Sequence, residues 1–304
     1  MATVLETVQV GLKRGGLSET NSTYKLDGLT YLNAVIKEIE GQATWWWKFK
    51  TGTITTTKTM TLSGIGSSEQ YAAGDTITGS SSSATATVVS HTAGESTLTF
   101  KSESGTFTTS DTVSGTSSGD LGTYVSDTAT RLYDGASTVP VQSLVSAFNE
   151  TSNNVLGIER PRIIQRYDPD LSDSGTPCFL YPWGINDSGV VQLALFPRDS
   201  TTNETITYQY YSYTPDFTED DYSKSLDPYI HPTLQSGLFF GIARLLKQQE
   251  GDDEGGLVEE AEFQKVLQRA RRNNINIFGD NVTRQLYPPM TDPAFNFTVR
   301  EGSL

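Results

Sequence analysis

The chain has little of what most catalytic and metal sites need. Its 304 residues include one cysteine, Cys178, and two histidines, His91 and His231. A single cysteine excludes a disulfide framework within one chain and is typical of a reducing compartment. Neither histidine has a cysteine or acidic residue at ligand spacing, which argues against a metal centre. We also find no nucleophile elbow and no phosphate-binding glycine loop. The sequence therefore predicts neither an enzyme nor a cofactor.

Positive charge is also scarce, with 22 Lys and Arg against 36 Asp and Glu, for a net charge of −14. A protein that clamps duplex DNA without sequence preference needs a basic surface, so this class is disfavoured. Long apolar runs are absent as well. No window approaches the length of a membrane span, and Met1–Arg14 lacks the pattern of a signal peptide. We expect no membrane partner.

Helical periodicity is concentrated towards the two ends of the chain. Near the C-terminus we expect two helices within 226–278, with Asp227 as a candidate N-cap and a break at Gly251–Gly256. Glycines at 237 and 241 share one helix face, and at about 1 kcal/mol each in a helix interior they predict close packing there. The residues that we expect to pack in the bundle or ring are Leu234, Gly237, Leu238, Gly241, Ile242, Leu245, Phe263 and Leu267.

Near the N-terminus we expect a short helix over 3–14 and a longer one from about Leu26, which ends in three consecutive tryptophans. Three successive side chains on a helix point in three directions. At least one of Trp45, Trp46 and Trp47 should therefore meet another domain or subunit, and all three are interface candidates. Packing against the β region is the simpler alternative.

The region between Lys50 and Tyr213 is typical of β-structure. Thr51–Leu62 alternates as a strand, and an internal repeat follows, in which residues 71–90 match 107–126 at a constant offset. Two copies are too few for a solenoid, so we expect one small barrel or sandwich. We expect residues 64–127 to form a separable module. From Arg131 onward, larger and more aromatic strands predict a second β domain.

These patterns predict an α+β fold, in which a bundle of N- and C-terminal helices carries a large inserted all-β region. That region comprises a β domain and a small Ser/Gly-rich β repeat module. The expected divisions are N-terminal helices at 1–50, the β-repeat module at 51–130, a β-sheet domain at 131–215, C-terminal helices at 216–278 and an extended tail at 279–304.

Four features together resemble a known family. They are the helices ending in tryptophan, the LFPRD turn followed by ITYQYY, the proline-started helix HPTLQSGLFFGIARLL and the final helix EEAEFQKVLQRARR. The chain is similar in these features to head-to-tail adaptor (connector) proteins of tailed bacteriophages. The resemblance covers about residues 1–50 and 130–278. The repeat departs from the family's minimal pattern.

This resemblance implies a structural protein of the virion neck, made in the host cytoplasm. Its helices would form a ring, usually a dodecamer, beneath the portal. The ring would join the portal to a tail or nozzle protein and line the channel through which double-stranded DNA leaves without specific binding. In such proteins the C-terminal tail reaches the portal. The portal-binding residues expected here are Leu286, Tyr287, Met290, Phe295 and Phe297.

Two points stay open from sequence. Acidic loops at Glu219–Asp221 and Asp252–Glu254 are available to line a channel that DNA must pass without sticking. The alternative function is a receptor- or carbohydrate-binding β protein of a phage tail appendage, with the repeat as its binding face.

Overall fold

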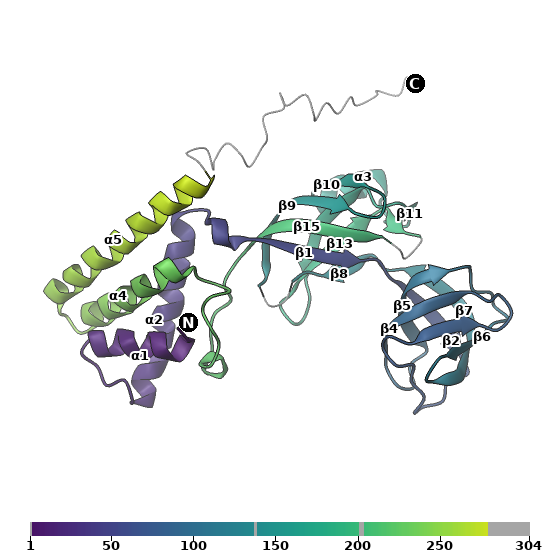
Figure 1. The fold of residues 1–304 in the computed structure, drawn as a ribbon, viewed down its shortest axis with the longest axis horizontal. Helices are drawn as coiled ribbons and strands as arrows, with labels where there is room; N and C mark the ends of the chain where they lie inside the picture. The colour runs from purple at the N-terminus through teal and green to yellow at the C-terminus, as the bar shows by residue number, and fades with distance from the viewer. Residues whose placement is uncertain (1, 137–138, 201–203, 279–304) are drawn as a thin grey trace, which may run out of the picture. The chain divides into compact units, whose positions relative to one another are not determined.

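We describe the protein from a computed structural model, which describes residues 2–136, 139–200 and 204–278 (Figure 1). The described chain divides into two compact units. The terminal unit holds the residues up to Phe49 and those from Ser212 onward. The central unit is Lys50–Tyr211. The chain passes between the units twice, at 49/50 and at 211/212.

The terminal unit is helical. Its α-helices are α1 (Val4–Arg14), α2 (Ser22–Gln42), α4 (Pro232–Gln249) and α5 (Asp253–Phe278), and two 3-10 helices, η1 (Trp46–Lys48) and η2 (Glu219–Asp221), lie in its connections. Thr3 and Glu6 form a capping box at the start of α1, and the Asn21 side chain caps α2. These polar caps satisfy amide groups that have no partner within the helix.

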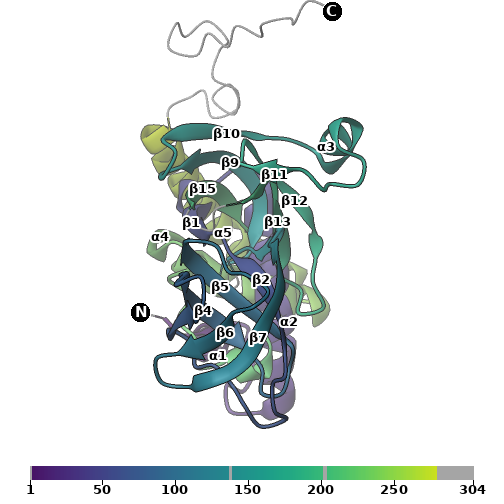
Figure 2. The same ribbon diagram turned by 90° about the vertical axis from the view of Figure 1, so that its right-hand side faces the viewer.

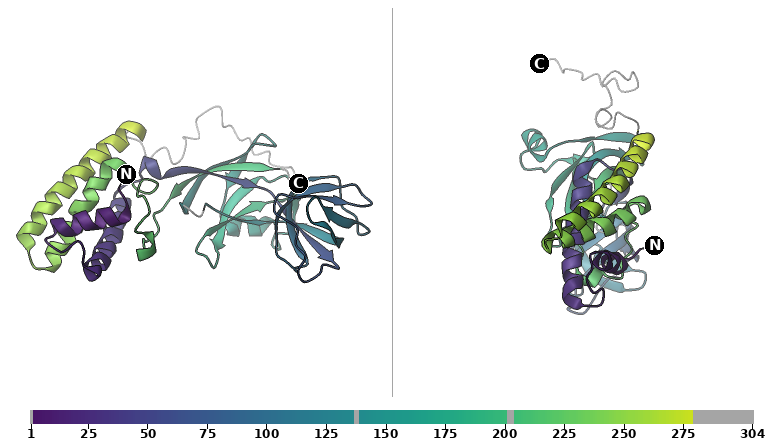
Figure 3. Two further views of the ribbon diagram at one scale, coloured as in Figure 1. Left: turned by 60° about the horizontal axis from the view of Figure 1, so that its bottom comes forward. Right: turned by 90° about the vertical axis from the view of Figure 1, so that its left-hand side faces the viewer.

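Helix α4 lies between α1 and α5 and also contacts α2 (Figures 1 and 3). Its close packing depends on Gly241, because a Cβ added there would lie 2.6 Å from Cγ1 of Val35 on α2. At Gly237 the nearest atom would be Cγ1 of Val266 on α5, at 3.1 Å. The two glycines thus let branched side chains of neighbouring helices approach the α4 backbone.

Three helix boundaries differ from those expected. His231, not Asp227, caps α4, and the Asp227 carboxylate instead accepts a hydrogen bond from Gln235 at 2.6 Å. The long N-terminal helix starts at Ser22 and ends at Gln42, so that the tryptophans lie after it. The expected break at Gly251–Gly256 is shorter, since α5 begins at Asp253.

Part of the central unit is a seven-stranded sheet, in the order β1-β15-β9-β10-β12-β13-β8. A short helix, α3 (Pro161–Tyr167), lies next to it, and a two-stranded ribbon joins β11 to β14. The sheet strands are β1 (Phe49–Thr55), β8 (Leu132–Asp134), β9 (Val141–Asn149), β10 (Asn154–Ile158), β12 (Phe179–Ile185), β13 (Val191–Phe196) and β15 (Thr205–Ser212); the ribbon strands are β11 (Ser174–Gly175) and β14 (Arg198–Asp199).

The other part of the central unit is a closed barrel, in the order β2-β5-β4-β3-β6-β7 (Figure 2). Its strands are β2 (Lys58–Ser63), β3 (Thr76–Gly79), β4 (Thr85–His91), β5 (Thr97–Ser104), β6 (Thr112–Gly115) and β7 (Gly119–Ala129). The single strand expected over 51–62 is therefore two strands, of which β1 joins the sheet and β2 joins the barrel. The interior is filled by alternating apolar residues, which include Met60, Leu62, Tyr71, Ile77, Leu98, Phe100, Phe107 and Val113.

The repeat gives this barrel an internal pseudo-two-fold symmetry. Strands β3 and β6 pair antiparallel with Thr78 opposite Ser114, which occupy the same position in the two copies. Strands β2 and β5 pair in the same way with Thr61 opposite Thr97. The two copies also exchange equivalent hydrogen bonds. The Thr76 amide donates to Thr116 Oγ1, and the Thr112 amide donates to Ser80 Oγ, each at 3.0 Å.

The expected fold class is wrong. The described residues form fifteen strands and five α-helices, and the strands make a closed barrel and a second, seven-stranded sheet. The fold is therefore mostly β and is not a helical bundle with an inserted β region. The strong helical periodicity of the chain ends outweighed the β pattern in that prediction, although the expected small barrel or sandwich is present as the closed barrel.

Candidate functional site

The terminal unit holds every expected site residue that the structure describes. The three tryptophans lie in and just before the 3-10 helix η1, not on the α-helix α2, and this lets two of them face the core. Trp45 and Trp47 are 1% and 7% exposed and stack with ring centroids 4.6 Å apart. Trp46 is half-buried, and its ring centroid lies 5.0 Å from that of His231. Trp46 is thus the one with a face free for a further contact.

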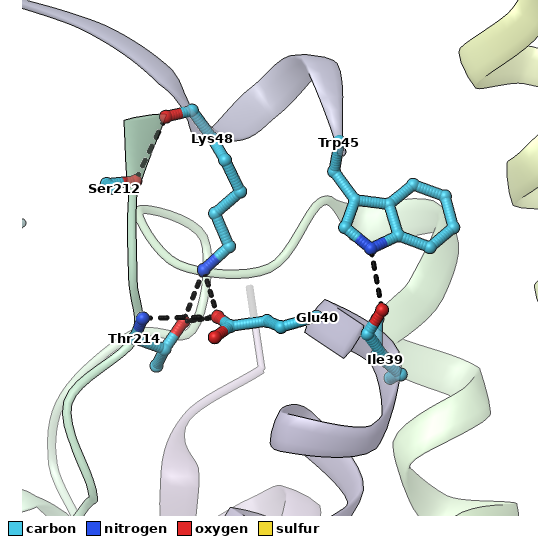
Figure 4. A network of polar contacts seen from close by, with 6 residues as sticks. All are labelled: Ile39, Glu40, Trp45, Lys48, Ser212 and Thr214. Carbon is cyan, nitrogen blue, oxygen red and sulfur yellow. Dashed lines mark hydrogen bonds and ion pairs between the residues drawn. The ribbon is translucent and has the colours of Figure 1, made fainter. Parts of the chain in front are cut away.

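Hydrogen bonds fix this tryptophan segment to two helices. The Trp45 indole Nε1 donates to the Ile39 carbonyl on α2 at 2.7 Å (Figure 4). Asn274 on α5 accepts from the Trp46 amide at 2.9 Å and donates to the Thr44 carbonyl at 3.0 Å. The end of α5 is therefore held beside the segment that leads out of the unit.

A polar network joins the two chain segments that leave the terminal unit (Figure 4). The Lys48 ammonium pairs with Glu40 and donates to Thr214 Oγ1, and Thr214 donates its amide to Glu40 at 3.1 Å. The Ser212 hydroxyl donates to the Lys48 carbonyl at 3.1 Å. Lys48 is 5% exposed, and removing one partner of a buried ion pair is costly. The network thus holds both exits of the unit together.

Ion pairs lock the helices to one another. Arg244 on α4 pairs with Glu38 on α2 at 2.6 Å and with Glu260 on α5 at 2.5 Å. Partial burial would raise the pKa of Glu260, but the hydrogen bonds from Arg244 and Gln264 outweigh it and lower that pKa. Glu259 of α5 pairs with Arg14 of α1 at 2.6 Å. The four helices therefore form one packed body with its charges matched inside.

The residues expected to pack in the bundle or ring lie inside this body. Seven of them are buried, and Leu245 is partly buried. They pack mainly against their own chain. Phe239 and Phe240 on the same helix are also partly covered, and the Arg14 guanidinium lies 4.4 Å from the Phe240 ring centroid.

A different set of apolar side chains remains exposed on the helices. Val10 on α1 is 44% exposed and Leu26 on α2 is 48% exposed, while Leu257 and Val258 at the start of α5 are 68% and 58% exposed. Ile275 near the other end of α5 is 43% exposed. Four of these five residues belong to α1 and α5, which lie on different sides of α4 (Figure 3). The sequence did not lead us to expect these residues to be exposed, since helical spacing placed Leu257 in the apolar line of its helix.

Both histidines have structural contacts. The His91 ring accepts the Tyr71 amide at 3.0 Å inside the barrel, and the His231 ring caps α4. Cys178 is exposed. Among the described residues there is no cluster of three potential metal ligands, and no described helix is long and apolar enough to cross a membrane. The expected portal-binding residues at 286–297 lie outside the described residues.

The two acidic loops are turns with internal bonds. Glu219–Asp221 forms η2, and Thr218 and Asp221 make a capping box there. The pKa of Asp221 is lowered by its contact with Lys224 and by the hydrogen bonds from Thr218. Asp252 accepts the Gly255 amide at 2.9 Å at the start of α5. The lowered pKa favours the ionised form of the Asp221 carboxylate.

Comparison with models of known protein families finds no match, and no curated protein is significantly similar in sequence.

Proposed function

We propose that the chain is a structural head-to-tail adaptor of a tailed bacteriophage. In this proposal many copies form a ring, a dodecamer by analogy with the family, beneath the portal protein. The ring connects the portal to a tail or nozzle protein in the neck of the virion and surrounds the channel for double-stranded DNA. Its role is mechanical, without catalysis or cofactor.

One observation carries the proposal. The terminal unit buries its core fully and still exposes large apolar side chains on both sides of α4, on α1 and on α5. A ring of identical copies needs two different surfaces per subunit that are complementary to each other. Exposed apolar groups that the monomer does not need are typical of such contacts. The resemblance of the helical sequences to adaptor proteins points in the same direction.

The net charge of −14 also suits the channel. An acidic lining repels duplex DNA, so the DNA slides past it. Counterion release drives the tight binding of DNA to basic proteins, and an acidic lining causes no such release. We propose that the portal contact is made by the tail after Phe278, with the Trp46 face as the alternative contact.

The test is assembly on the purified portal of the same phage. The variant Leu257→Glu with Val258→Glu should stay folded and lose ring formation, because two charges would have to be buried at each subunit contact. A matched control is Gln268→Glu with Arg269→Gln, which changes the charge of the same helix by the same amount at exposed positions. If the Leu257/Val258 variant assembles as well as wild type, this surface is not the ring contact.

A further inference from the structure

A cavity of about 350 Å³ lies in the central unit, between α3 and the sheet. It is lined by Ile163 and Ile164 of α3 and by Phe179 and Phe196, which are cross-strand partners in β12 and β13. The two phenyl rings have centroids 6.5 Å apart and are only partly buried. The cavity therefore has an apolar lining that is open to a ligand.

Two carboxylates complete the lining. Glu159 follows β10, and Asp173 precedes β11, so they enter from the two chain segments that flank α3. Within the described part of the chain, neither carboxylate has an ion-pair partner. The neighbouring Arg160 and Arg162 are exposed and make no salt bridge to them within the described residues.

The backbone holds Asp173 in place on both sides. Its carbonyl accepts the Arg198 amide at 3.1 Å, and its amide donates to the Asp168 carboxylate at 2.9 Å. That amide lowers the pKa of Asp168. The same pKa is raised by a hydrogen bond with Asp170, by burial and by the charges of Asp173 and Asp170. These effects together are larger, so the pKa of Asp168 is raised overall. The position of Asp173 at the edge of the cavity is thus fixed through its own backbone.

We propose that this cavity binds the side chain of a lysine presented by a partner protein. The aliphatic stem of lysine packs on apolar surface while its ammonium stays at the polar edge. Its three N–H donors match the oxygens of two separate carboxylates. The size also agrees, because pockets of roughly 300–1,000 Å³ hold small ligands, and this one is at the lower end of that range.

The proposal goes beyond the adaptor function and does not depend on ring formation. A lysine on the tail or nozzle protein is the natural source in a neck assembly, but the recognition chemistry is the same for any partner. The proposal predicts that the affinity of aliphatic ligands depends on the charge of their head group and not on their apolar length alone.

The experiment uses the full chain and three probes with the same six-carbon chain, namely hexylammonium, 1-hexanol and hexanoate, followed by NMR of the isoleucine methyl groups. Hexylammonium should bind about threefold to tenfold more tightly than hexanol, which corresponds to ~0.7–1.4 kcal/mol in total for two exposed charge pairs. Hexanoate should bind most weakly. The variant Glu159→Gln with Asp173→Asn should bind hexylammonium no better than hexanol.

The matched control is Glu95→Gln with Asp187→Asn, which removes two exposed carboxylates that do not line the cavity. This control should keep the preference for hexylammonium. Circular dichroism verifies that each variant is folded. Equal binding of all three probes to the wild type would overturn the proposal, as would an unchanged preference in the Glu159/Asp173 variant.

Discussion

Asp75 and Asp111 occupy the same position in the two copies of the barrel repeat, and each accepts hydrogen bonds from serines of the other copy. Asp75 accepts the hydroxyls of Ser117 and Ser118 at 2.5 and 2.8 Å. Asp111 accepts the amides of Ser81 and Ser82 at 2.7 and 2.8 Å. The exchange ties the two halves together through their turns, so the Asp and Ser positions of the repeat have a structural role in closing the barrel.

The first prediction concerns the pH dependence of the barrel. Burial would raise the pKa of Asp111, but hydrogen bonds from Ser82, Thr108 and Ser81 outweigh it and hold that pKa well below its ordinary value. A carboxylate with a lowered pKa stabilises the fold above its unfolded-state pKa of about 3.9, and this stability is lost as the pH falls towards the folded-state pKa. Thermal unfolding should show the barrel losing stability below about pH 4.

The variant Asp111→Asn should be less stable than wild type at pH 7 and should lose less on acidification. Asp75→Asn should show a smaller change, because Asp75 is less buried and accepts fewer of these bonds. A steeper acid dependence in Asp111→Asn than in wild type would contradict this account.

A second prediction concerns the junction network. Lys48→Met leaves the Glu40 carboxylate beside Thr214 without its cation, and breaking a buried pair in this way costs about 3 kcal/mol. Chemical denaturation of the full chain measures the loss. The double variant Lys48→Met with Glu40→Gln should recover part of it, since no unpaired charge then remains. Equal losses in the single and double variants would show that packing, not the ion pair, is the source.

The third prediction uses two glycines in helices. Gly241→Ala places a methyl group against Val35, and overpacking of this kind costs about 1–3 kcal/mol. Gly41→Ala, in the last turn of α2, meets nothing within 4 Å and should be neutral or stabilising by up to about 1 kcal/mol. The denaturation midpoint should fall for Gly241→Ala and stay equal or rise for Gly41→Ala. If both moved upward, the α4–α2 contact would be looser than described.

A fourth prediction concerns DNA. Rings assembled on the portal should not retain duplex DNA at low salt, because the chain has an excess of acidic groups. Filter retention at low and high salt measures this. Tight binding that weakens with salt would require a basic lining and would contradict the proposed channel.

Sequence periodicity was sufficient to predict individual elements and one small barrel or sandwich, but not which strands close the barrel. Alternation predicted strands in the repeat, and its two copies predicted a compact β module. Closure depends on β2, which pairs with β5 on one side and β7 on the other. Those contacts are far apart in sequence, and nothing in Lys58–Ser63 distinguishes a barrel strand from a continuation of β1.

Local chemistry also explains the errors at helix ends. Asp227 looked like a cap, but the Leu226 carbonyl accepts the Tyr229 and Ile230 amides in a turn that delays the helix to Pro232. The tryptophans follow the α2 C-cap at Ala43, which is extended, so their directions no longer follow helical spacing. The Lys48–Glu40–Thr214 network could not be predicted, because it joins three segments that only the fold brings together.

The most direct test of the central claim is the number of copies of this chain on one portal assembly, determined by reconstruction of the purified neck. The adaptor account predicts a closed ring of many identical copies, with α1 of one copy facing α5 of the next. A neck that contains this chain in only one or two copies would contradict it.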